Sequence, residues 1–139
     1  DSLKARVIHG INQLEKKIRI RRENWEKYQK FLNCESLIPL QDEGSIPWRA
    51  SYRIEGMDYF SQNEISNSIR ANGFDVSNWY LPAHWYIDPR DSTDLNLQNT
   101  VKLSKEIIQF WVDRELNFSH FNSLNDIINR LIDEERQGN

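Results

Sequence analysis

The residues best suited to chemistry in this sequence lie close together between positions 80 and 86. Tyr80 and His84 offer a hydroxyl and an imidazole, and Trp85 and Tyr86 offer rings on which a ligand could stack. A histidine in a loop can serve as a general acid or base, or donate a hydrogen bond to a ligand. The alternative is that His84 anchors its own loop and that the rings cover a small core. From the chemistry of the residues alone, the loop-anchoring role is favoured.

Other kinds of chemical site are absent from the sequence. The three histidines, His9, His84 and His120, are far apart, and Cys34 has no neighbouring cysteine, so no metal site is predicted. The five glycines form no phosphate-binding loop, and no GxSxG serine-hydrolase motif occurs. The lysines all fall on predicted polar helices, and none is expected in a pocket where it could act as a nucleophile. The chain by itself is therefore predicted to have no catalytic residues and no cofactor.

Length and composition predict one globular domain, residues 1–139. Hydrophobic residues make up 38% and charged residues 28% of the chain, and the net charge is −3. A negative net charge gives no general attraction to nucleic acid or to anionic lipid, and no apolar run is long enough to cross a membrane. The sequence has no signal peptide and a single cysteine, which favours a cytoplasmic protein. It opens at Asp1 without an initiator methionine, as expected of a processed chain or an excised piece.

A long helix is predicted over residues 1–33. Its apolar positions recur at helical spacing and are Leu3, Val7, Ile11, Leu14, Ile18, Trp25, Tyr28 and Leu32. Such a helix would be about 45 Å long, so we expect its first half to project, leaving apolar surface exposed or packed on another copy. The basic run from Lys16 to Arg22 either contacts nucleic acid or forms a solvated face. The acidic chain favours the solvated face.

Residues 34–139 are predicted to form an α+β unit. Short strands are expected at 37–40, 48–54 and 74–80, with Trp48 and the alternate residues up to Ile54 on one face. Ser61 and Glu64 form a capping-box pattern that would start a helix ending at Asn72-Gly73.

The second half of the chain completes the predicted sheet. A long loop is expected over residues 81–97, followed by a helix at 98–105 with Val101 and Leu103 as its apolar anchors. Residues 107–112 should form the central strand, with Ile107 among its core residues. A closing helix is predicted to begin at Ser123 and to fray in its polar tail. The simplest arrangement is a small antiparallel or mixed sheet with helices packed on one face.

Three stretches together resemble the DegT/DnrJ/StrS-type sugar aminotransferases. Residues 22–32 match an R-x-x-A-x-x-Y-x-x-x-L helix, with Trp25 in place of the small residue. Gly73-Phe74 followed by Tyr80-x-Pro82-x-His84 resembles a "GI … Y-x-P-L-H" segment, with Ala83 in place of leucine. Residues 98–116 resemble an "A-x-x-L … LP" stretch, although the small-residue ending is replaced.

This resemblance is to the C-terminal small domain of those enzymes. They are homodimeric, pyridoxal-phosphate-dependent proteins that transfer an amino group to a keto-sugar nucleotide in sugar or surface-polysaccharide biosynthesis. The large domain, which carries the lysine that binds the cofactor, has no counterpart here. The resemblance implies that residues 1–33 join this missing domain and that Tyr80 and His84 border a substrate cleft between the domains.

Two other interpretations remain open at this point. The chain could be a non-catalytic binding or regulatory module that kept the small-domain fold. It could also be an unrelated α+β module whose basic helix binds nucleic acid, which a salt-dependent DNA titration would test.

Overall fold

The computed structural model describes residues 2–40, 44, 46–78, 81–82, 86, 97–113 and 116–138. The described elements are α1 (Ser2–Phe31), β1 (Ile38–Pro39), β2 (Arg49–Arg53), α2 (Tyr59–Ala71), β3 (Val76–Ser77), α3 (Gln98–Glu106), β4 (Ile107–Trp111) and α4 (Phe118–Gly138). The strands form one antiparallel sheet in the order β1-β2-β4-β3. The predicted α+β class, the antiparallel sheet and the long first helix are confirmed.

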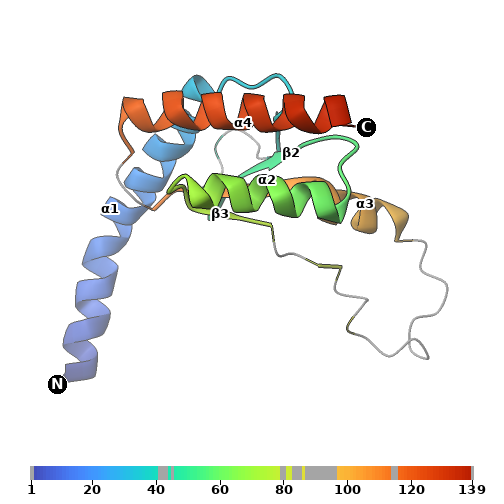
Figure 1. Cartoon of the computed structure of the whole chain (residues 1–139). Coiled ribbons are helices and arrows are strands. Elements are labelled where there is room, and N and C mark those ends of the chain that lie inside the picture. The colour runs from blue at the N-terminus through green and yellow to red at the C-terminus, as the bar shows by residue number, and fades with distance from the viewer. Residues whose placement is uncertain are drawn as a thin grey trace.

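The core lies between one face of the sheet and three helices. The C-terminal half of α1 packs there together with α2 and α4 (Figure 1). Side chains alternate between the two faces of the sheet along β2 and β4, and those that lie in this layer are Ala50, Tyr52, Ile108 and Phe110. Tyr28 of α1 joins the helices to the sheet, because its ring lies 5.5 Å from that of Phe110 and 5.0 Å from that of Phe121 in α4.

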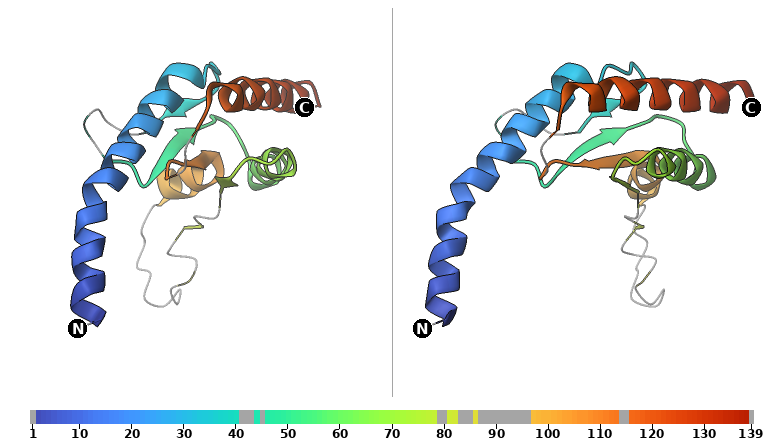
Figure 2. Two further views of the ribbon diagram at one scale, coloured as in Figure 1. Left: turned by 90° about the vertical axis from the view of Figure 1, so that its left-hand side faces the viewer. Right: turned by 60° about the vertical axis from the view of Figure 1, so that its left-hand side comes forward.

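The N-terminal half of α1 projects away from this body (Figures 1 and 2). Its large apolar side chains, Leu3, Val7, Ile11 and Leu14, are exposed. The prediction that this half would leave apolar surface uncovered within one chain is therefore confirmed. The matched motif of residues 22–32 serves packing, since Trp25, Tyr28 and Leu32 are buried and Arg22 is exposed.

Two helix starts were predicted in the wrong place. α2 begins at Tyr59, and Asp58 is its N-cap, accepting a 2.8 Å hydrogen bond from the Ser61 amide. α4 begins at Phe118 rather than at Ser123, and the Asn117 side chain accepts a 2.9 Å hydrogen bond from the His120 amide. In both cases an Asp or Asn slightly earlier in the chain caps the helix instead of the serine. α4 also continues through Gly138, into the tail predicted to fray.

The end of α2 is as predicted. Gly73 has φ 86°, the left-handed conformation that glycine adopts most readily. The Gly73 amide donates to the Arg70 carbonyl at 2.9 Å and the Phe74 amide to the Ile69 carbonyl at 3.3 Å. This pair of bonds closes the helix in a Schellman motif.

Several predictions of which side chains lie in the core are also wrong. Trp48 precedes β2 and is exposed, with the Arg21 guanidinium 4.8 Å from its ring centroid. In β4 the buried residues are Ile108 and Phe110, so Ile107 lies on the opposite face and is only partly buried. Leu103 is exposed, and α3 buries Ser104 and Glu106 in its place. Of the predicted strand at 74–80, β3 contains Val76 and Ser77, while positions 79 and 80 lie outside the described residues.

Within the described residues, no helix combines the length and the apolar character that crossing a membrane requires.

Candidate functional site

The face of the sheet opposite the core helices carries a row of polar side chains. Residues paired across an antiparallel ladder lie on the same face, and the register pairs Gln109 of β4 with Ser51 of β2 and with Ser77 of β3. Ser51 and Ser77 are both buried, even though α1, α2 and α4 lie on the other face. We call Ser51, Gln109 and Ser77 the polar row.

Two atoms of the polar row have unused hydrogen-bonding capacity. The Gln109 Nε2 atom donates to the Ser51 Oγ atom at 2.9 Å, which fixes the amide across β2 and β4. Its Oε1 atom and the Ser77 Oγ atom are buried and have no hydrogen-bond partner among the described residues. Buried polar atoms in folded proteins are nearly always paired. A water, a ligand or a side chain from outside the described residues would satisfy these two.

An ion pair lies one row along this face. Arg53 is paired with Ile107 in the ladder, next to the Ser51–Gln109 pair. Its Nε atom donates to the Glu106 Oε2 atom at 2.6 Å, and a second guanidinium nitrogen lies 2.7 Å from Glu55. The backbone amide of Gly56 donates to the Glu106 Oε1 atom at 2.9 Å. Arg53 is thus an ion-pair partner, as expected for an arginine on the outer face of a strand.

The environment of Glu106 keeps it ionised. Burial by itself raises the pKa of this carboxyl. The hydrogen bond from Gly56, together with the hydrogen bond and the charge of Arg53, outweighs burial and leaves the pKa below its usual range. Glu106 is therefore a buried anion that ties β2 and the turn after it to the start of β4.

α3 positions Glu106 through buried polar contacts with α2. The Gln62 side chain donates to the Ser104 carbonyl at 2.9 Å and to the Ile107 carbonyl at 2.6 Å. The Ser104 hydroxyl is 2.6 Å from that of Tyr59. These bonds explain why α3 buries Ser104 and Glu106 rather than an apolar stripe.

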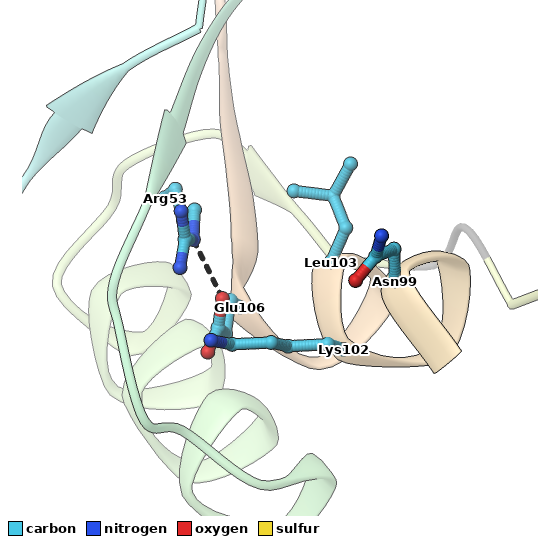
Figure 3. A pocket seen from close by; sticks show the side chains of 5 residues that line it. All are labelled: Arg53, Asn99, Lys102, Leu103 and Glu106. Carbon is cyan, nitrogen blue, oxygen red and sulfur yellow. Dashed lines mark hydrogen bonds and ion pairs between the residues drawn. The ribbon is translucent and has the colours of Figure 1, made fainter. Parts of the chain in front are cut away.

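The ion pair borders an open pocket of about 290 Å³. Its lining residues are Arg53, Asn99, Lys102, Leu103 and Glu106 (Figure 3). The figure shows Lys102 extending from α3 toward Glu106. The expectation that no lysine lies at a pocket is therefore wrong for Lys102, although this side chain is exposed and two cations share the lining with one carboxylate.

At the opposite end of the face, the Arg49 guanidinium packs on the ring of Trp111. The two residues are paired in the ladder, and the Arg49 Cζ atom lies 3.1 Å from the Trp111 ring centroid. Arg49 is buried. Cation–π contact of this kind stabilises a guanidinium that has been removed from water.

The residues predicted to contact substrate cannot be placed on this face. Tyr80 and His84 lie outside the described residues, as does Trp85, while Tyr86 is exposed. The described histidines do not form a metal site either: His9 is on the projecting half of α1, and His120 packs edge-on against Phe74 at 4.7 Å. Over the described part of the chain, no cluster of metal-ligating side chains is found.

The polar row and Glu106 were missed by the sequence reasoning. The pattern of residues 48–54 predicted that Arg49, Ser51 and Arg53 lie on the polar face of a strand. It did not predict which residues these three contact. One available signal was Gln109, which interrupts the most apolar run of the chain, IIQFWV. A lone amide within such a run indicates a strand with one polar face.

The fold matches part of several solved enzyme structures, some of them aminotransferases. The matches include 3-amino-5-hydroxybenzoic acid synthase (15% identity, TM-score 0.72, 88% of this chain and 36% of that one). They also include a DegT DnrJ EryC1 StrS aminotransferase from Brucella abortus (15%, 0.69, 88% and 33%). A third is E. coli GDP-4-keto-6-deoxy-D-mannose-3-dehydratase with bound hydrated PLP (18%, 0.67, 87% and 33%). No family model matches the sequence, and no curated protein matches it.

These likenesses establish the fold. Identities of 15–18% are too low to carry over individual residues, but the match extends over 87–88% of this chain. The chain spans about a third of the length of each of these proteins. It therefore has the fold of one part of such an enzyme.

Proposed function

We propose that this chain is the C-terminal small domain of a pyridoxal-phosphate-dependent aminotransferase that acts on a keto-sugar nucleotide in sugar or surface-polysaccharide biosynthesis. The observation that carries the proposal is the fold match over nearly the whole chain to about a third of several solved enzymes, among them a DegT DnrJ EryC1 StrS aminotransferase. The polar row supports it, because two buried atoms there have no hydrogen-bond partner in the described chain and a second domain could supply one.

We propose that the chain alone holds no cofactor. Pyridoxal phosphate needs an imine-forming lysine held in a dry pocket. All seven lysines are described, and none is buried. Lys27, which is half-buried, donates to the Leu116 carbonyl at 3.2 Å, and Lys102 lies on an open pocket. We propose that a large domain, joined through residues 1–33, supplies the lysine, and that Tyr80 and His84 border the substrate cleft between the domains.

Borohydride trapping tests this proposal. The chain is incubated with pyridoxal phosphate, reduced, digested and analysed by mass spectrometry. We expect weak, substoichiometric labelling spread over exposed lysines and no spectral change with glutamate. One dominant labelled lysine, with glutamate-dependent turnover, would show that the chain holds an active site of its own and would overturn the proposal.

The coding sequence upstream of Asp1 provides a second test. The proposal requires a large domain with a cofactor lysine in the same reading frame. A different upstream protein, together with the absence of trapping, would favour a non-catalytic binding or regulatory module with this fold.

A further inference from the structure

One face of α3 is turned toward the pocket beside the ion pair. The other four lining residues follow the order i, i+3, i+4 and i+7 along this helix, which places Asn99, Lys102, Leu103 and Glu106 on one side of it. Arg53 faces them from β2 (Figure 3). The space between them, about 290 Å³, lies at the lower end of the volumes of ligand pockets and suits a small molecule.

Three hydrogen-bond donors in the lining have no partner among the described residues. They are the Lys102 ammonium, the Asn99 amide and one nitrogen of the Arg53 guanidinium, Nη1. Lys102 and Asn99 are exposed, so water solvates them when the pocket is empty. An acceptor that enters the pocket can take all three donors from water at once.

The Arg53 guanidinium is already fixed in position. Its Nε atom donates to Glu106 at 2.6 Å, and its Nη2 atom donates to Glu55 at 2.7 Å. A side chain held at two of its three nitrogens has little conformational freedom left to lose. An acceptor that binds Nη1 therefore avoids most of the entropy cost of ordering an arginine.

The charge of the lining selects the class of acceptor. Arg53 and Lys102 are cations and Glu106 is an anion, so the lining has one net positive charge. Glu55 pairs with Arg53 from outside the pocket, and its side chain is 62% exposed, so water screens its charge. A ligand with one negative charge neutralises this lining, whereas the Glu106 carboxylate repels a phosphate dianion more strongly.

Leu103 gives the pocket an apolar wall. It is a large apolar side chain on α3, yet it is 39% exposed. The aliphatic part of a ligand would cover it, and burying that apolar surface adds to affinity.

We propose that this pocket binds a monocarboxylate with a short aliphatic chain. The carboxylate accepts hydrogen bonds from the Lys102 Nζ and Arg53 Nη1 atoms, with the Asn99 amide as a third donor. The aliphatic chain lies against Leu103. The inference does not rest on the proposed enzyme function, because all five lining residues belong to this chain.

Nuclear magnetic resonance of the ¹⁵N-labelled chain tests the binding. Sodium butyrate is added up to about 30 mM at constant ionic strength, because a ligand of this size should have a dissociation constant on the order of 1 mM. We expect saturable shifts of the α3 backbone amides and of the Arg53 Nε signal. Shifts that are absent, or that rise linearly without saturation, would overturn the proposal.

Two lysine substitutions on α3 test the position of the carboxylate. Lys102→Met removes the ammonium that lines the pocket and should weaken butyrate binding by at least about fivefold. Lys105→Met removes the same charge from the same helix outside the lining, where the ammonium lies 5.6 Å from the Tyr59 ring centroid. It should bind butyrate like wild type. Equal affinities of the two variants would contradict the assigned site, and circular dichroism checks that both keep the fold.

Chain length tests the role of Leu103. In the wild-type chain, butyrate should bind about fivefold more tightly than acetate, because its two additional methylenes cover Leu103. Leu103→Ala should reduce this ratio to about twofold or less. An unchanged ratio would show that the aliphatic chain does not lie on Leu103.

Inorganic phosphate tests the charge of the ligand. At pH 8 it is mainly a dianion, and it should bind more weakly than butyrate. Tighter binding of phosphate would overturn the assignment to a monocarboxylate. These titrations detect reversible binding, whereas borohydride trapping detects an imine on a lysine, so this proposal and the proposed function fail separately.

Discussion

At the scale of single residues, Phe110 is the centre of the core. Its side chain is fully buried, 5.5 Å from the ring of Tyr28 and 6.0 Å from that of Tyr52. Phe110→Ala should lower the free energy of unfolding by about 3–5 kcal/mol, since it removes buried contacts and leaves a cavity. Urea denaturation measures this loss.

Phe60 provides the matched control for that substitution. It is an exposed phenylalanine in the first turn of α2, so Phe60→Ala should change the free energy of unfolding by no more than about 0.5 kcal/mol. Equal losses for the two variants would show that β4 does not face the helices as described.

Glu106 is the second residue for which a definite result is expected. Its pKa is lowered in the folded chain, so its contribution to stability is fully present above the pKa of an unfolded glutamate, about 4.3. That contribution is lost as the pH falls through the lower folded pKa. Glu106→Gln should therefore be clearly less stable than wild type at pH 7, and the difference should shrink as the pH falls toward 3.

Denaturation at both pH values checks this, with Glu64→Gln as the control. Glu64 is exposed on α2, so its substitution should have little effect at either pH. A Glu106→Gln deficit that is the same at pH 7 and pH 3 would mean that the carboxylate charge does not stabilise the fold.

At the scale of elements, α2 depends on Asp58 for its start. The Asp58 side chain accepts the Ser61 amide, and this hydrogen bond lowers the pKa of the carboxyl. Asp58→Ala should lower Tm by a few degrees, because a free amide is left without its cap. Asp58→Asn should retain most of the stability, since asparagine caps equally well. If Ser61→Ala lowered Tm more than Asp58→Ala, Ser61 would be the cap after all.

At the scale of the whole molecule, the two halves of α1 should be separable. The second half contributes Trp25 and Tyr28 to the core, while the first half projects from it. Residues 18–139 should therefore unfold cooperatively, with a free energy of unfolding within about 1 kcal/mol of that of the full chain. Thermal and urea unfolding of the shortened chain measure this. Loss of the cooperative transition would mean that the first half supports the fold.

Much of the architecture could be predicted from residue patterns, because those patterns are local. Helical spacing predicted α1 correctly, Asn72-Gly73 predicted the end of α2, and the run at 107–112 predicted β4. The stripe from Leu3 to Leu14 also predicted exposed surface, because a chain of 139 residues cannot cover both ends of so long a helix. The family resemblance led to the fold that the aminotransferase structures share.

The candidate site depends on contacts between residues far apart in the chain. Ser51, Gln109 and Ser77 come together only through the register of three strands, and Glu106 meets Arg53 only because α3 packs on α2. Local patterns specify which face a residue prefers, but they do not specify which strand lies beside it or which polar group finds a partner. Those outcomes follow from burying one common core. In the part of the chain that the structure describes, the Glu106 carboxylate then has hydrogen-bond partners, and the Gln109 and Ser77 side-chain oxygens have none.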